Sequence, residues 1–256
     1  MEKTMSSTSS SQPQMTLYVL AAGLFPPRVL IYLKEKGVPA TAIRIVEVGM
    51  SSKGVNIERI LSNNPTNSDM LLNRAKTVPV LEIQNSDWSK SFITESIAIL
   101  QYLEEIFHGD SEMKNMTGDN PYERARHAEI LSTAVEMTDF VALYLHKASA
   151  VFVGLEEQPV DAARILLERG RKRLVDLEHK IDEHGPFMCG PHVRLVDCVA
   201  YASFQFFVNA YGIADVMFKD CAKLEQWYHM FEKRESASVE QMPEWFKQKA
   251  REVSVK

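Results

Sequence analysis

Glu95 and Ser96 stand together at the predicted start of a helix, where their side chains could bind a charged ligand. The first turn of a helix has backbone N–H groups without partners, and with the Ser96 hydroxyl they can hold a ligand carboxylate. The Glu95 carboxylate can accept hydrogen bonds from a ligand ammonium group. The pair therefore fits an amino-acid head group. The alternative is an ordinary helix start, because an acidic side chain favours the helix dipole and a hydroxyl can cap.

Val78 and Pro79 lie in an apolar segment that is typical of a strand. Proline cannot donate a hydrogen bond to a sheet ladder, so it belongs at the start or the edge of a strand. A cis bond before Pro79 would expose the backbone N–H and C=O of Val78 to a ligand. An ordinary edge proline is the alternative, because only about 5–6% of X-Pro bonds are cis.

Strands and helices alternate over residues 15–107, and these elements must position the residues above. This alternation predicts a partly parallel sheet whose strands are joined by crossovers. The predicted strands cover 16–20, 42–48, 78–83 and 88–92, and the predicted helices cover 26–36, 55–63 and 94–107.

The chain changes character after residue 120, where helical periodicity replaces the strand pattern. The segment 195–211 is apolar on nearly every side, which is typical of a helix at the centre of a bundle. The predicted helices cover 122–152, 159–183, 195–211, 223–234 and 243–253. We therefore expect a disordered tail (1–14), an α/β domain (15–108), a linker (109–120) and an all-helical domain (121–256).

The composition is typical of a soluble globular protein, with 256 residues that are 45% hydrophobic and 25% charged. The net charge of −5 and the lack of a Lys/Arg-rich run argue against nucleic acid as a partner. Three cysteines without CxxC spacing predict reduced thiols and no metal site. The apolar run 15–25 is too short to span a membrane and lacks the flanks of an export signal. We expect a cytoplasmic protein with no membrane partner.

Six segments follow one another in an order that resembles the glutathione S-transferase family over about residues 15–240. They are LYVL with its loop and helix, TVPVLEI, TESIAILQYLEE, NPYERAR, GPFMCGPHVRLVDCVAYASF and LEQWYHMFEKRESA. The resemblance implies an α/β thioredoxin-like N-terminal domain and an all-α C-terminal domain. It also implies a homodimer with glutathione, as cosubstrate or cofactor, in a cleft between the two domains.

The resemblance assigns the centre of a glutathione site by position. Val78, beside a cis Pro79, would present its backbone N–H and C=O to the cysteinyl part of glutathione. Glu95 and Ser96 would hold the γ-glutamyl ammonium and carboxylate groups. This assignment agrees with the amino-acid site that the residue types alone suggest.

The resemblance also assigns the two outer parts of the site. The glycine carboxylate of glutathione would meet Lys53 or Asn56, between which the sequence does not decide. The pocket for a hydrophobic second substrate would be lined by Leu24, Phe25 and Tyr144.

The loop AAGLFPPR departs from the family pattern, because it lacks a Ser, Cys or Tyr to stabilise the glutathione thiolate. Gly23 occupies the position of the usual Ser or Cys. The backbone amides of Gly23, Leu24 and Phe25 could stabilise a thiolate without any side chain. Tyr18 is the nearest hydroxyl, and a structural role in the first strand is its main alternative.

Three functions remain open at this point. The first is a glutathione transferase-like enzyme that adds the thiolate to a hydrophobic electrophile. The stretch FPPRVLIYLKEKGV resembles fungal members and suggests secondary metabolism. The second is a glutathione-dependent cis–trans isomerase, and the third is a non-catalytic glutathione-binding or scaffold protein.

Overall fold

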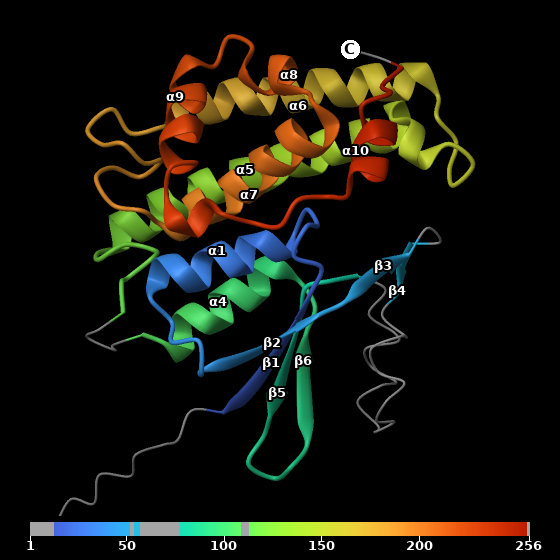
Figure 1. Ribbon diagram of the computed structural model, residues 1–256. Coiled ribbons are helices and arrows are strands. Elements are labelled where there is room, and N and C mark those ends of the chain that lie inside the picture. Colours follow the sequence, from blue (N-terminus) through green and yellow to red (C-terminus); the bar gives the residue numbers. More distant parts are fainter. Residues whose placement is uncertain (1–12, 52–53, 57–76, 109–112, 255–256) are drawn as a thin grey trace, which may run out of the picture.

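The computed structural model describes residues 13–51, 54–56, 77–108 and 113–254. Figure 1 shows a twisted sheet with two helices above it, and a larger group of helices stacked on those two. The predicted α/β part followed by an all-helical part is therefore confirmed. The exact boundaries of 1–14, 15–108, 109–120 and 121–256 stay predictions.

The sheet has the strand order β2-β1-β5-β6. Strand β1 is parallel to β2 and antiparallel to β5, and β5 is antiparallel to β6. The partly parallel sheet that the sequence predicts is thus confirmed. The strands are β1 (Gln14–Val19), β2 (Ile43–Glu47), β5 (Val80–Gln84) and β6 (Lys90–Ile93).

Helices α1 (Pro26–Lys36) and α4 (Ser96–Ile106) join the sheet to the helical part. Proline in the first turn starts α1, and Gly37, with a φ of 86°, ends it in the left-handed conformation that glycine tolerates best. A buried ion pair joins the two helices, with 2.9 Å between Lys36 Nζ and Glu104 Oε2. The ion pair therefore ties the C-terminal ends of the two helices together.

Two element predictions in the α/β part need correction. Residues 54–56 form strand β4 (Gly54–Asn56), which pairs with β3 (Gly49–Ser51), whereas a helix was predicted from residue 55; residues 57–63 lie outside the described residues. Strands β3 and β4 have three residues each, and local helical spacing cannot reveal a pairing between two such short segments. Strand β6 begins at Lys90 and not at Trp88, because Trp88 has a φ of 67° in the preceding turn.

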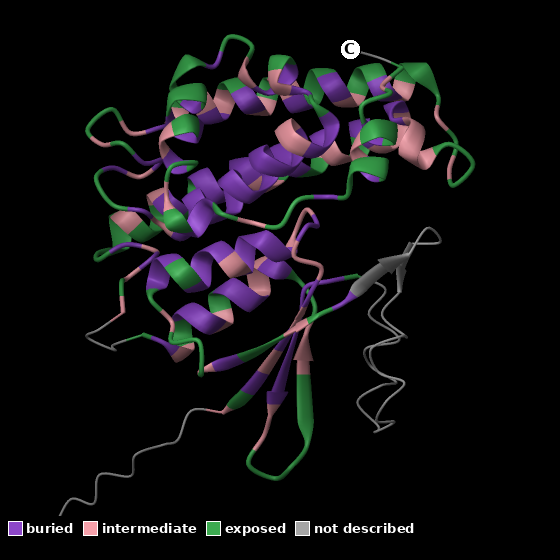
Figure 2. Cartoon of the chain, in the orientation of Figure 1, coloured by how far each residue is buried: buried purple, intermediate pink, exposed green. Residues whose placement is uncertain are grey.

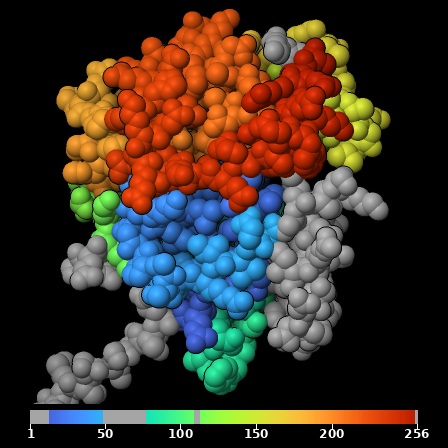
Figure 3. All heavy atoms as spheres, in the orientation of Figure 1, coloured from blue at the N-terminus to red at the C-terminus, as the bar shows by residue number. Residues whose placement is uncertain are grey.

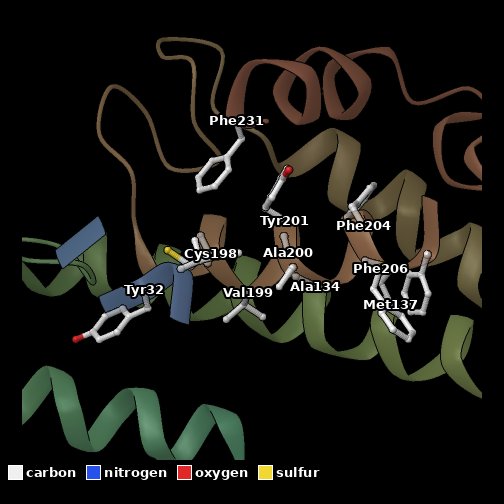
Figure 4. Close-up of a cluster of buried hydrophobic side chains, with 14 of the residues drawn as sticks. Tyr32, Ala134, Met137, Cys198, Val199, Ala200, Tyr201, Phe204, Phe206 and Phe231 are labelled. Carbon is white, nitrogen blue, oxygen red and sulfur yellow. The ribbon is translucent and has the colours of Figure 1, made fainter. Parts of the chain in front are cut away.

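The helical part surrounds one buried helix. Figure 2 shows α7 as almost continuously buried, and Figure 4 shows its side chains against those of α1, α5 and α9. The predicted segment 122–152 divides into α5 and the 3₁₀ helix η1, because the Ser149 hydroxyl accepts a hydrogen bond from the Val151 N–H. The helices are α5 (Pro121–Ala148), η1 (Ala150–Phe152), α6 (Val160–Lys180), α7 (Leu195–Tyr211), α8 (Ala214–Phe218), α9 (Ala222–Phe231), η2 (Glu235–Ala237) and α10 (Glu244–Ala250).

Asp197 anchors the start of α7 with three hydrogen bonds. Its carboxylate accepts from the Arg194 N–H at 2.8 Å, and from the Met188 N–H and the Trp227 indole N–H at 2.9 Å each. These bonds tie the helix to the preceding loop and to α9. Within the described residues, no helix combines the length and the apolar character that a membrane crossing requires.

Candidate active site

One end of the sheet brings three of the predicted segments together. Tyr18 pairs with Val80, and Leu81 pairs with Ile93. Continuing both registers by two residues places Leu20 opposite Val78 and Glu95 opposite Pro79. The loop after β1, the Val78–Pro79 bond and the start of α4 therefore meet at the same edge.

The peptide bond between Val78 and Pro79 is cis, as the ligand interpretation requires. The β5 ladder begins only at Val80. Among the described residues, the backbone N–H and C=O of Val78 have no hydrogen-bond partner. Both groups are thus available to a ligand in an extended conformation.

The start of α4 carries the second part of the candidate site. Glu95 is extended, with φ −102° and ψ 128°, and its exposed side chain does not cap the helix. The amides of the first helical turn therefore lack a side-chain acceptor. Ser96 is 6% exposed, and its hydroxyl oxygen accepts a hydrogen bond from Arg28 Nη1 at 3.4 Å. Its own O–H remains able to donate.

Arg28 is a site residue that the sequence analysis missed. Its guanidinium is buried beside Ser96, donates to Ser203 Oγ at 3.0 Å, and lies 4.9 Å from the centre of the Phe25 ring. Burial lowers the pKa of Arg28 to about 10, and Asp139 opposes that shift. The side chain is thus positively charged at neutral pH. An arginine within the apolar run PPRVLIYL was the signal that could have identified it.

Asp139 adds a second carboxylate near Glu95. Partial exclusion of water raises the pKa of Asp139, Arg28 opposes this, and Glu136 and Glu95 add to the rise. The contribution of Glu95 to the raised pKa of Asp139 indicates that the two acidic side chains are electrostatic neighbours. A positive charge on Arg28 and negative charges on Glu95 and Asp139 suit a ligand that carries both a carboxylate and an ammonium group.

An apolar cavity of about 380 Å³ lies between the β1–α1 loop and the helical part. The structure places Leu24 and Phe25 in its lining; their contact with a substrate stays a prediction. On the face that Figure 3 draws, the C-terminal segment, in red, lies across the boundary between the two parts. The lining residues are Leu20, Gly23, Leu24, Phe25, Pro26, Thr77, Val78, Ala142, Leu145, His146, Val151, Phe152, Phe206, Phe207, Tyr211, Met242 and Phe246.

The predicted contribution of Tyr144 to this pocket is not what the structure shows. Tyr144 is 0% exposed and lies in the core, where burial raises its pKa to about 12. Its neighbours Leu145 and His146 line the cavity instead. Successive residues of a helix are about 100° apart, so one step along α5 separates the core from the cavity.

The loop amides are only partly available for a thiolate. The Gly23 N–H already donates to the Leu20 carbonyl at 2.8 Å. The N–H groups of Leu24 and Phe25 have no such partner among the described residues. Tyr18 is not in the cavity lining, and its hydroxyl donates to Glu82 Oε2 at 3.2 Å. Of the three backbone amides predicted to stabilise a thiolate, those of Leu24 and Phe25 are therefore available to donate.

His146 is a polar residue of the cavity lining that the sequence analysis did not identify as a site residue. Its Nδ1 lies 2.6 Å from Glu156 Oε1, and its ring stacks on Phe152 at 3.8 Å. Lys147 also bonds to Glu156. A carboxylate at Nδ1 fixes the tautomer in which Nε2 can accept a proton. The sequence did not reveal the pairing of His146 with Glu156, because Glu156 follows the ends of α5 and η1 and no helical spacing connects the two residues.

The structure says little about the residues predicted to bind the glycine carboxylate, and it disfavours reactive cysteines. Lys53 lies outside the described residues, and Asn56 is seen only as the last strand residue of β4, opposite Gly49. The contact with the glycine carboxylate therefore stays a prediction. Burial raises the pKa of Cys189 to about 12 and of Cys221 to about 11, which opposes thiolate formation. No group of three potential metal ligands occurs within the part of the chain that the structure describes.

Comparisons with known proteins agree with this geometry. The family model of the glutathione S-transferase N-terminal domain matches residues 23–106. Maleylacetoacetate isomerase maiA of Aspergillus fumigatus is 32% identical over 116 residues, so the match covers 45% of this chain and 45% of that protein. Glutathione S-transferase 2 of Saccharomyces cerevisiae is 24% identical over 226 residues, which cover 87% of this chain and 88% of that protein.

The likeness extends to solved structures. One is a glutathione transferase family member from Pseudomonas fluorescens with two glutathione bound. It matches with a TM-score of 0.67 and 13% identity, and the match covers 96% of each chain. The mixed sheet, the helical part and the matched N-terminal domain together show that this chain has the glutathione S-transferase fold.

Proposed function

We propose that the chain binds glutathione at the start of α4 and uses its thiol on a substrate in the apolar cavity. The observation that carries this proposal is the arrangement of Ser96, Arg28 and the uncapped first turn of α4. A γ-glutamyl carboxylate would accept hydrogen bonds from the Ser96 hydroxyl and the helix amides, in the positive field of Arg28. Glu95 would hold the ammonium group, and the Val78 backbone would pair with the cysteinyl unit.

In this proposal His146 removes the proton from the thiol. A free thiol has a pKa of about 8.5, so little thiolate is present at neutral pH without assistance. The carboxylate of Glu156 orients the imidazole through its contact with Nδ1. The amides of Leu24 and Phe25 would then stabilise the thiolate at the start of α1. This arrangement replaces the hydroxyl that the loop lacks.

The apolar lining of the cavity supports a hydrophobic electrophile as the second substrate. Addition of the thiolate to its carbon makes the chain a transferase. We place this enzyme in the cytoplasm, as a homodimer that acts in secondary metabolism. These three assignments rest on the family resemblance.

The isomerase alternative shares the first step, because the thiolate adds and later leaves. The similarity to maleylacetoacetate isomerase maiA favours the isomerase alternative. Maleylacetoacetate, however, carries carboxylate groups, which a cationic side chain in the cavity would be expected to bind. None of the described residues that line the cavity is Arg or Lys. Turnover without consumption of glutathione would establish isomerisation, and net consumption would establish conjugation.

The binding site is tested by glutathione titration of Glu95→Ala in a calorimeter. Loss of a charged hydrogen-bond acceptor should raise the Kd about tenfold to a hundredfold. Glu105→Ala is the matched control, because Glu105 is exposed near the far end of the same helix. Equal affinity of wild type and Glu95→Ala would show that the assigned site is wrong.

A non-catalytic protein remains the third candidate, favoured by the absent loop hydroxyl. It predicts that wild type binds glutathione and shows no activity with a broad panel of electrophiles. Activity that depends on His146 would exclude it.

A further inference from the structure

Tyr211 places a hydroxyl group in the wall of the apolar cavity. It is the last residue of α7, is 5% exposed, and belongs to the cavity lining. Its ring is held edge-on between Phe206, with 5.7 Å between ring centres, and Phe246, with 6.0 Å. The position of the ring is thus fixed by packing from two elements, α7 and α10.

The Tyr211 hydroxyl makes no hydrogen bond with any of the described residues, and its oxygen keeps accessible surface although the residue is only 5% exposed and lines the cavity. An accessible hydroxyl in an apolar lining can donate to a ligand, so a ligand that accepts its hydrogen bond gains affinity there. Burial raises the pKa of Tyr211, so the group is a neutral donor at neutral pH. His146, in the same lining, already has Glu156 as a partner.

We propose that Tyr211 is a specificity-determining residue that selects electrophiles with a neutral oxygen conjugated to the reacting carbon, as in an α,β-unsaturated ketone. This proposal rests on the proposed function, since it concerns the second substrate of the same site. A neutral donor matches a carbonyl oxygen better than a carboxylate, since the lining residues that the structure describes include no Arg or Lys.

The reaction that such a substrate undergoes explains the need for the donor. The thiolate sulfur bonds to the β-carbon, and the π electrons of the carbon–carbon double bond form a new double bond to the carbonyl carbon. The carbonyl π electrons move to oxygen, where the Tyr211 O–H stabilises the enolate by a hydrogen bond. The proton that His146 took from the thiol then returns to the α-carbon. Tyr211 keeps its own proton throughout.

The test compares Tyr211→Phe with wild type on two electrophiles and glutathione. Benzylideneacetone offers a ketone oxygen, whereas benzyl bromide reacts by loss of bromide, a poor hydrogen-bond acceptor. Loss of a donor to developing negative charge should lower kcat/KM for benzylideneacetone about 100-fold. The value for benzyl bromide should change less than about threefold, since phenylalanine keeps the ring contacts.

Tyr201→Phe is the control variant, because Tyr201 lies in the same helix but outside the cavity lining. It should leave both rates unchanged. A binding experiment uses S-methylglutathione, which cannot react. With S-methylglutathione bound, Tyr211→Phe should raise the Kd of benzylideneacetone about three- to tenfold. The Kd of butylbenzene, which has no oxygen, should not change.

The outcomes separate this inference from the proposed function. If Tyr211→Phe distinguishes the two electrophiles, or the two ligands, as well as wild type does, Tyr211 does not determine specificity. The proposed conjugation activity would be unaffected by that result. Failure of the wild type to bind either benzylideneacetone or butylbenzene would overturn the cavity as the acceptor site. A third outcome is that wild type binds glutathione but converts neither electrophile, while Tyr211→Phe binds benzylideneacetone more weakly as predicted. This result would support the role of Tyr211 in binding and overturn the proposed transferase activity.

Discussion

Replacement of His146 by phenylalanine is expected to lower kcat/KM for glutathione conjugation about 100-fold at neutral pH. The reason is that His146 is the side chain in the cavity lining that can accept the thiol proton, with Glu156 at its Nδ1. Phenylalanine preserves the stacking on Phe152, so the cavity wall should keep its shape. Steady-state kinetics with saturating electrophile and varied glutathione give the value.

The kinetics of this variant have two internal controls. The Kd of glutathione should be nearly unchanged in His146→Phe, because in the proposed binding mode the amino-acid end of the ligand lies at α4, away from His146. His184→Phe should behave as wild type, since His184 is almost fully exposed and outside the cavity lining. A His146→Phe enzyme with wild-type kcat/KM would rule out His146 as the base and leave the loop amides to activate the thiol.

The second large effect concerns stability. Substitution of Asp197 by alanine should lower the free energy of unfolding by about 3–5 kcal/mol, because three buried N–H donors lose their acceptor at once. The donors belong to Met188, Arg194 and Trp227. Urea denaturation followed by tryptophan fluorescence measures the change, and Asp197→Asn should lose less because it retains one acceptor oxygen.

The same residue predicts a pH dependence with a defined sign. Burial raises the pKa of Asp197 to about 6 despite the opposing hydrogen bonds from Met188, Arg194 and Trp227. The pKa of Asp197 in the folded state is thus above its value of about 3.9 in the unfolded chain. The contribution of this carboxyl group to the free energy of unfolding is therefore fully present below the unfolded-state pKa. It is lost as the pH rises through about 6. Asp197→Asn should remove this dependence, and an unchanged pH profile in that variant would contradict the assignment.

Much of the fold could be predicted from the sequence because its periodicities are strong. The apolar segment 195–211 predicts the buried helix α7 at the bounds that the structure shows. The alternation of strands and helices predicts the mixed sheet around β1 and β5. Short elements were missed, since strand β3 and helix α8 are too brief to show a period.

The site was less accessible to sequence reasoning, because its residues meet only through tertiary packing. Val78 and Glu95 were predicted from local chemistry, and the sheet register places them at one edge. Arg28 reads as a surface residue until its burial against Ser96 and Ser203 is seen. The choice between Tyr144 and His146 depends on a single step of helix rotation, which the broad apolar character of α5 does not specify.

The most direct test of the proposed chemistry is the ultraviolet difference absorbance of the glutathione thiolate on the protein. Titration of wild type with glutathione at neutral pH should produce the thiolate band, and S-methylglutathione, which has no ionisable thiol, should produce none. The pH dependence of the band should give a thiol pKa at least about one unit below the free value near 8.5. Calorimetric saturation with glutathione without any thiolate band near neutral pH would contradict thiolate activation by this site.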